Sequence, residues 1–109
     1  MIEIKDETEK VILVGVALSD QDDTKESLEE LKDLVSTAGA ETAGMLIQNR
    51  EQQHPATYVG KGKIEELKNM IWELRATGIV CDDELSPAQM KNLQDELDVK
   101  VMDRTLIIL

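Results

Sequence analysis

Two glycines and two lysines stand together in the segment Gly60-Lys61-Gly62-Lys63, where an extended stretch gives way to a helical pattern. Glycine lets a backbone approach a ligand closely. The first turn of a helix offers unpaired N–H groups and a partial positive charge. Because the two lysine side chains add further positive charge, this segment predicts a site for a phosphate or another anion.

The segment departs from the established phosphate-binding motifs. A P-loop requires a glycine, four residues, and then Gly-Lys-Ser/Thr, whereas here the glycines are two apart and Ile64 follows Lys63. A tight turn with solvated lysines is therefore the alternative interpretation. Arg50 and Tyr58 lie near in sequence and would add a guanidinium fork and a stacking ring to a nucleotide- or phosphate-binding site.

The acidic run Asp82-Asp83-Glu84 is a second candidate, because it follows a short apolar strand pattern. Open α/β sheets bind ligands at the carboxyl ends of their strands, and clustered carboxylates can hold Mg²⁺. Alternatively, these acids stabilise the start of the next helix through its dipole. His54 has no Ser or Cys at the spacing of a catalytic triad, so we expect a surface residue. Cys81 lies in an apolar run and is expected in the core.

These residues belong to a chain that alternates between strand and helix patterns. Apolar and β-branched runs predict strands at 10–17, 42–48, 79–81 and 99–102, and helical spacing of apolar residues predicts helices from 23 or 24 to 38, from 62 to 76 and from 87 through Leu97. Residues 56–60 either pair back as a hairpin or lead into the next helix. The alternation predicts an α/β fold with a small, mainly parallel sheet of four to five strands and three helices on its two faces.

The helix boundaries carry their own signals. Asp23 with Glu26 and Ser86 with Gln89 are spaced as capping boxes, and Pro87 suits a first helical position. Gly39 and Gly78 are the expected helix stops. The apolar end of the chain, after Arg104, is expected to lead into a missing helical region that it packs against.

The composition of the chain excludes several classes of protein and of binding site. The chain has 109 residues, one cysteine, and 2% aromatic residues, so an internal disulfide and a platform of several stacking aromatics are excluded. We find no apolar run long enough to span a membrane, and the N-terminus is too acidic for a signal peptide. The formal net charge is −11, with ten acids against three lysines in residues 1–30 and four acids against five bases in residues 49–75. A nucleic-acid-binding protein working alone is therefore not expected, whereas a local anion site in the middle third is compatible with the charge distribution.

Three segments together resemble the N-terminal domain of the HflX family of ribosome-associated GTPases. They are residues 55–67 (PATYVGKGKIEEL), residues 82–93 (DDELSPAQMKNL) and residues 99–105 (VKVMDRT), and residues 10–47 are similar to the opening of the family. The resemblance covers nearly the whole chain. Asp98 stands where relatives often have glycine.

The resemblance implies a domain at residues 1–104, with 105–109 beginning the linker to absent helical and G domains. It implies a non-catalytic fragment that contributes to rRNA or nucleotide binding and to regulation of the GTPase. The full-length protein is then expected to bind GTP and Mg²⁺, to hydrolyse GTP, and to split or rescue ribosomes through the large subunit in the cytoplasm. The suspected contact maps onto Gly60 to Lys63 and onto Asp82 to Glu84. A Mg²⁺-dependent module that binds ATP or GTP at its own strand ends is the alternative.

Overall fold

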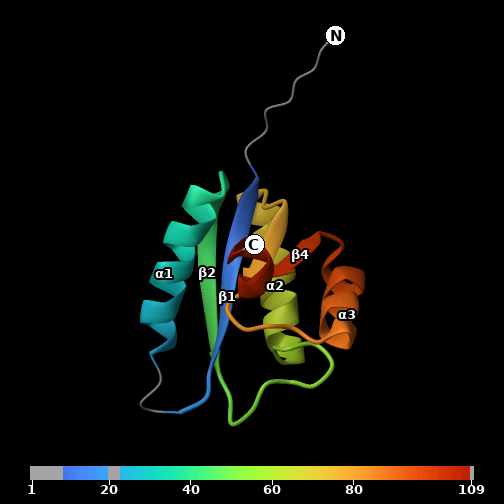
Figure 1. The fold of residues 1–109 in the computed structure, drawn as a ribbon. Helices are drawn as coiled ribbons and strands as arrows, with labels where there is room; N and C mark the ends of the chain where they lie inside the picture. The colour runs from blue at the N-terminus through green and yellow to red at the C-terminus, as the bar shows by residue number, and fades with distance from the viewer. Residues whose placement is uncertain (1–8, 20–22, 109) are drawn as a thin grey trace.

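The computed structural model of the chain describes residues 9–19 and 23–108, and in it a parallel sheet lies between two layers of helices (Figure 1). The strands are β1 (Lys10–Ala17), β2 (Glu41–Asn49), β3 (Gly78–Cys81) and β4 (Lys100–Asp103), and the helices are α1 (Thr24–Thr37), α2 (Lys61–Leu74), α3 (Pro87–Leu97) and α4 (Arg104–Ile108). The four strands are all parallel, in the order β2-β1-β3-β4. The predicted fold class is confirmed, with a fourth, short helix in addition to the three expected. Residues 20–22, in the acidic stretch Asp20-Gln21-Asp22-Asp23, lie outside the described residues, as does Leu109.

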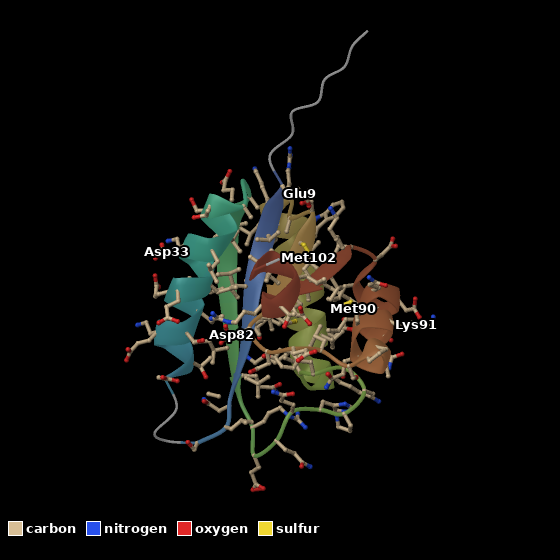
Figure 2. All side chains as sticks on the ribbon, in the orientation of Figure 1. Glu9, Asp33, Asp82, Met90, Lys91 and Met102 are labelled. Atoms are coloured by element: carbon tan, nitrogen blue, oxygen red, sulfur yellow. The ribbon has the colours of Figure 1, made fainter. Side chains whose placement is uncertain are left out.

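The core lies on both faces of the sheet, as the continuous apolar run of β1 predicts. Ile12, Val14 and Val16 belong to the cluster that α2 and α3 cover. Val11 and Leu13 belong to the cluster on the other face, which also contains buried residues of α1 and receives Ile107 of α4. Each such side chain contributes roughly 1.5–3 kcal/mol on burial, which makes β1 the strand that anchors the fold. The charged side chains of Asp33 on α1 and Lys91 on α3 point outward (Figure 2).

The strand order changes direction between β1 and β3. The chain moves from β1 to its neighbour β2 on one side, and then crosses over to place β3 on the other side of β1. In an open parallel sheet, such a switch point leaves a crevice outside the carboxyl ends of the two strands. The residues that follow β1 and β3 are therefore the ones to inspect for a ligand site.

Two local expectations are wrong, and one open alternative is decided. Asp23 makes no side-chain capping bond, and its φ of −105° and ψ of 32° are not the extended geometry of an N-cap. Gly78 does not close α2 but begins β3; α2 closes at Arg75, in the left-handed conformation with φ 57°. Of the two alternatives for residues 56–60, the structure has the one that leads into the next helix: the pairing there is an isolated bridge between His54 and Tyr58, and Gly60 is the N-cap of α2.

The boundaries of α3 are confirmed. Ser86 accepts a hydrogen bond from the N–H of Gln89, and the Gln89 side chain accepts one from the N–H of Ser86. At the other end, Asp98 is left-handed with φ 56°, a conformation that glycine adopts more readily. In the part of the chain that is described, every helix is too short or too polar to cross a membrane.

Candidate functional site

The glycine–lysine segment forms the start of α2, where its two glycines differ in surroundings. Gly60 is the N-cap and is buried, because Arg50 and Gln48 lie over it. A Cβ atom added to Gly60 would come within 2.7 Å of Nη1 of Arg50, whereas one added to Gly62 would meet nothing within 4 Å. Gly60 is thus needed for the close approach of Arg50, and Gly62 leaves the backbone of the first turn open.

The backbone amides of this first turn are unequally available. The N–H of Gly60 donates to Oε1 of Gln48 at 2.8 Å, so it is already satisfied. The next three amides, at Lys61, Gly62 and Lys63, occupy the helix positions that have no partner within a helix. Because Lys61 and Gly62 are exposed, the open face of the turn offers amide donors to an anion.

The two lysines also play different parts. Nζ of Lys63 lies 3.0 Å from a carboxylate oxygen of Glu66, one turn along α2. Lys61 instead lines a hollow of about 420 Å³ together with His54 and Thr57, and Glu65 and Glu96 line the same hollow. The positive charge that the sequence predicts at this place is therefore carried by Lys61 and, from the neighbouring loop, by Arg50, whose Nε donates to the carbonyl of Gln52 at 2.9 Å.

A compact turn from His54 to Tyr58 holds the segment in place. Nδ1 of His54 accepts hydrogen bonds from the N–H groups of Ala56 (3.1 Å) and Thr57 (3.3 Å). From α3, the side-chain amides of Gln89 and Asn92 donate to the carbonyls of His54 and Ala56, both at 2.9 Å. His54 is thus half-buried and organises the turn, rather than being the plain surface residue expected from the sequence.

Tyr58 is turned away from solvent. It has φ 68°, a strained conformation for a residue other than glycine, and its side chain is 0% exposed. Its hydroxyl donates to Oδ2 of Asp83 at 2.6 Å, and burial together with this bond raises the pKa of the phenol well above its usual range. The ring is therefore buried here, and the expected role of Tyr58 as a stacking face stays a prediction. The side chain instead ties the glycine–lysine segment to the loop after β3.

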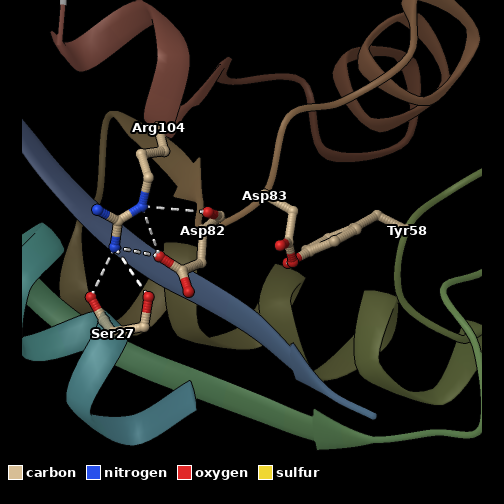
Figure 3. A network of polar contacts seen from close by, with 5 residues as sticks. All are labelled: Ser27, Tyr58, Asp82, Asp83 and Arg104. Carbon is tan, nitrogen blue, oxygen red and sulfur yellow. Dashed lines mark hydrogen bonds and ion pairs between the residues drawn. The ribbon is translucent and has the colours of Figure 1, made fainter. Parts of the chain in front are cut away.

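Two of the three acids of that loop, Asp82 and Asp83, are engaged with protein groups (Figure 3). Oδ1 of Asp82, whose side chain is only 9% exposed, lies 2.7 Å from Nη2 of Arg104. The same guanidinium nitrogen donates to the carbonyl and the hydroxyl of Ser27 in α1, at 2.8 and 2.9 Å. Asp83 accepts from Tyr58, and Glu84 is exposed. Within the described ranges, no three His, Cys, Asp or Glu side chains gather as metal ligands, and the magnesium site at Asp82, Asp83 and Glu84 stays a prediction.

The sequence motifs assign no role to Asp103 or Arg104, but in the structure both side chains hold separate elements together. Oδ2 of Asp103 accepts from the N–H of Leu85 at 2.9 Å, and its Oδ1 accepts from the N–H of Leu106 at 3.1 Å. Together the two residues fasten the junction between β4 and α4 to the loop after β3. The signal was the pair Asp103-Arg104 directly after an apolar strand, but a single sequence does not reveal which carboxylate or carbonyl an arginine will meet.

Comparison with known proteins gives a consistent result. Residues 25–109 match the family model "GTP-binding GTPase N-terminal". Among curated proteins, the chain is 63% identical over all its 109 residues to "GTPase HflX" of Lacrimispora saccharolytica, of which it covers 26%, and 45% identical to that of Caldanaerobacter subterraneus subsp. tengcongensis, of which it covers 25%. It is 36% identical to "GTPase HflX" of Escherichia coli, again over all its residues and 25% of the relative. The chain thus spans about a quarter of the length of these relatives.

Solved structures show the same fold. A crystal structure of SsGBP in complex with GDP has a TM-score of 0.68 and 20% sequence identity, with 93% of this chain and 28% of that chain covered. A GTP-binding protein from the archaeon Sulfolobus solfataricus, in complex with GDP, has a TM-score of 0.66 at 20% identity, with 94% of this chain and 29% of that chain covered. At this identity the likeness concerns the backbone arrangement.

Proposed function

The chain belongs to the HflX family of GTPases, as its N-terminal domain, and from this premise we propose that it is a non-catalytic domain that binds anionic oxygen atoms of rRNA or a nucleotide. The observation that carries the proposal is the open first turn of α2, where Lys61 and Gly62 are exposed and the guanidinium of Arg50 lies over Gly60. Lys61 also lines a hollow of about 420 Å³, which it shares with Glu65 and Glu96. A helix N-terminus with free amides favours phosphate groups.

In this proposal, residues 1–104 form the domain, and residues 105–109 begin the connection to a helical region and a GTP-hydrolysing domain. GTP and Mg²⁺ would bind in the latter, because this sequence contains no Gly-x₄-Gly-Lys-Ser/Thr motif. The full-length protein would act on the large ribosomal subunit, splitting or rescuing ribosomes, and this domain would help to dock it and to regulate its GTPase. A ribosomal partner implies a cytoplasmic location.

The proposal is tested by reversing charge at the loop in the full-length protein. The variant Lys61→Glu/Lys63→Glu should bind large ribosomal subunits more weakly, and the slope of log affinity against log salt should become shallower by about one for each lost phosphate contact. The matched control is Lys25→Glu/Lys32→Glu, which makes the same change in net charge on exposed positions of α1, in the opposite helical layer. Binding would be measured by co-sedimentation across a salt series.

The comparison of the two variants decides the outcome. If both lose affinity equally, the effect comes from the overall field of the chain, which already carries a net charge of −11. If neither changes the affinity or the salt slope, the glycine–lysine segment does not contact the ribosome. A change in GTP turnover with unaltered ribosome affinity would instead indicate a domain that only regulates the GTPase.

A further inference from the structure

The outer face of α2 carries an aromatic ring that the fold does not use. Trp72 stands near the end of this helix, and 84% of its side chain is exposed, the largest share among the exposed apolar side chains of the described residues. It is also the only tryptophan of the chain. Tryptophan is enriched among the residues that dominate binding to a partner, because its ring offers a large and rigid contact surface. The ring is therefore available to a ligand or partner.

Three basic residues share this face of α2. Lys61, Lys68 and Arg75 follow one another at intervals of seven residues, and Trp72 stands four residues after Lys68 and three before Arg75. Residues at spacings of three, four and seven lie on the same side of a helix. The ring is thus flanked by two cations, within the segment 49–75, where bases outnumber acids.

The two flanking cations differ in what they already bind. Nζ of Lys68 lies 3.2 Å from a carboxylate oxygen of Glu65 and 3.7 Å from one of Glu96, so its charge is compensated. Arg75 is exposed, and within the described ranges its guanidinium has no ion-pair partner. Arginine holds phosphate through two parallel N–H donors. Arg75 is therefore the cation beside the ring that can accept a phosphate group.

The ring and Arg75 border a hollow of about 710 Å³, whose other lining residues are Ile71, Glu73 and Ala76. The apolar atoms of Ile71 and Ala76 suit the flat surface of a nucleobase. The carboxylate of Glu73 can accept a hydrogen bond from an exocyclic amino group of a base, as acidic side chains do from cytosine. The same carboxylate repels phosphate, which leaves the side of Arg75 for the backbone of a nucleic acid.

The surroundings of the ring favour a nucleic acid over a protein as its partner. The exposed or half-exposed neighbours of Trp72 on this face are polar, namely Lys68, Asn69, Glu73 and Arg75, whereas the centre of a protein interface is depleted in charge. Indole surfaces flanked by cations are what single-stranded nucleic acids bind, since every base has a face that stacks. In duplex RNA those faces are already stacked.

The length of the basic row points to a strand. Lys61, in the open first turn, and Arg75, at the end of the helix, are separated by about 21 Å along α2. Within the described ranges Lys61 also has no ion-pair partner. A strand of several nucleotides reaches both cations, whereas one nucleotide does not.

We propose that the tryptophan face of α2, which consists of Lys61, Lys68, Trp72 and Arg75, binds unpaired RNA, with a base stacked on the indole of Trp72 and an adjoining phosphate on Arg75. This inference rests on the proposed function and narrows it, because it makes the partner a stretch of single-stranded RNA rather than a free nucleotide. The phosphate contact at the first turn of α2 and the base contact at Trp72 then belong to one continuous surface.

The first experiment uses the fluorescence of Trp72, which reports on this place alone because the 109-residue chain has no other tryptophan. An oligoadenylate of about 12 nucleotides, within the usual size of a single-strand site, is titrated at low salt and should quench the emission to a plateau. A duplex RNA of the same length and heparin, a polyanion without bases, should leave the emission unquenched. Oligoadenylate that fails to quench Trp72 would overturn the proposal.

The second experiment compares variants by the anisotropy of a labelled oligoadenylate. Trp72→Ala should weaken binding by at least about fivefold, because stacking on an aromatic ring is lost. Trp72→Phe should retain most of the affinity, and Trp72→Leu, which is apolar without a ring, should not. The matched control is Leu106→Ala, which removes another exposed apolar side chain, in α4. Circular dichroism establishes that each variant is folded.

Arg75→Gln tests the phosphate contact next to the ring. In the full-length protein it should make the slope of log ribosome affinity against log salt shallower by about one. Lys25→Gln, on exposed α1, makes the same change in charge and should leave the slope unaltered. Equal effects of the two variants would show that Arg75 acts only through the net charge of the chain, which contradicts the proposal.

Ribosome co-sedimentation of the full-length Trp72 variants separates this inference from the proposed function. If Trp72→Ala changes neither ribosome nor oligoadenylate affinity while Lys61→Glu/Lys63→Glu weakens both, the first turn of α2 binds RNA and the inference is wrong. If Trp72→Ala weakens both affinities and the lysine variant does not, the base contact stands and the anion site at the first turn fails. Ribosome affinity that is lost with Trp72→Ala and fully restored by Trp72→Leu would indicate packing against a protein, which overturns the inference.

Discussion

Cys81 is the residue that makes the stability of this domain sensitive to mildly alkaline pH. The thiol is 0% exposed at the end of β3, and burial, followed by the nearby carboxylate of Asp103, raises its pKa well above the usual value. The folded state therefore keeps the proton that the unfolded chain releases. The free energy of unfolding is unaffected by Cys81 below about pH 8.5 and falls above it, by up to about 1.4 kcal/mol per pH unit.

We expect urea denaturation to give a free energy of unfolding that decreases between pH 8.5 and 10 in the native sequence. Cys81→Ala should flatten this dependence, although it lowers the stability at neutral pH by leaving a small cavity. The slope against pH is the quantity to compare. Above about pH 10 the buried Tyr58 adds a loss of the same sign, since its pKa is also raised. Equal slopes for the two proteins between pH 8.5 and 10 would contradict the prediction.

The role of single residues was only partly predictable from the sequence. The burial of Cys81 follows from its apolar, β-branched neighbours, and the structure agrees. Tyr58 illustrates the limit: its place next to the glycine–lysine segment was visible, but its direction was set by a bond to Asp83, 25 residues away. Arg104 likewise depends on Asp82 and Ser27, which are distant in sequence. Local patterns carry no information on such pairings.

Helices α1 and α3 begin with similar sequence signals but with different geometry, which gives a matched pair of variants. Ser86→Ala should lower the free energy of unfolding by about 1 kcal/mol, because Ser86 Oγ accepts from the N–H of Gln89 at 3.1 Å. Asp23→Ala removes no capping bond, so its effect should be limited to the helix dipole and should fade in high salt. Urea denaturation at low and high salt measures both. Equal, salt-independent losses would show that Asp23 caps α1 in solution.

Element existence was predictable and element boundaries were less so. All four strands and the three longer helices follow from apolar periodicity, because that periodicity is the imprint of burial on one or two faces. The predicted end of α2 is wrong. The sequence offers Gly78 as the stop, whereas in the structure Arg75 adopts the left-handed conformation and ends the helix. The short helix α4 starts directly after β4 with Asp103 bonding the N–H of Leu106, a cap whose residue belongs to the preceding strand.

At the scale of the whole molecule, the topology and the candidate site point to different places. The strand order puts the switch point between β1 and β3, where open α/β sheets receive ligands. Here Arg104 extends to that point and joins Asp82, after β3, to Ser27, in the first turn of α1 (Figure 3). An ion pair between the side chains of Asp82 (9% exposed) and Arg104 (25% exposed) lies at this switch point. The open first turn of α2 is a separate place. Tyr58, two residues before the N-cap of α2, links it to Asp83 in the loop after β3.

This arrangement predicts the result of titrating Mg²⁺ with ATP or GTP into the 109-residue chain by calorimetry. We expect no Mg²⁺-dependent heat from the strand ends, because a ligand there would have to break the Asp82–Arg104 pair and leave a largely buried charge without its partner, which costs about 3–5 kcal/mol. Two variants distinguish heat that arises at the switch point from heat that arises at the first turn of α2: Asp82→Asn alters the first place, and Lys61→Glu/Lys63→Glu alters the second. Heat that requires Mg²⁺ and vanishes with Asp82→Asn would show that the switch point binds nucleotide after all. Heat that vanishes only with the lysine variant would arise at the first turn of α2, since its amides need no metal to hold a phosphate.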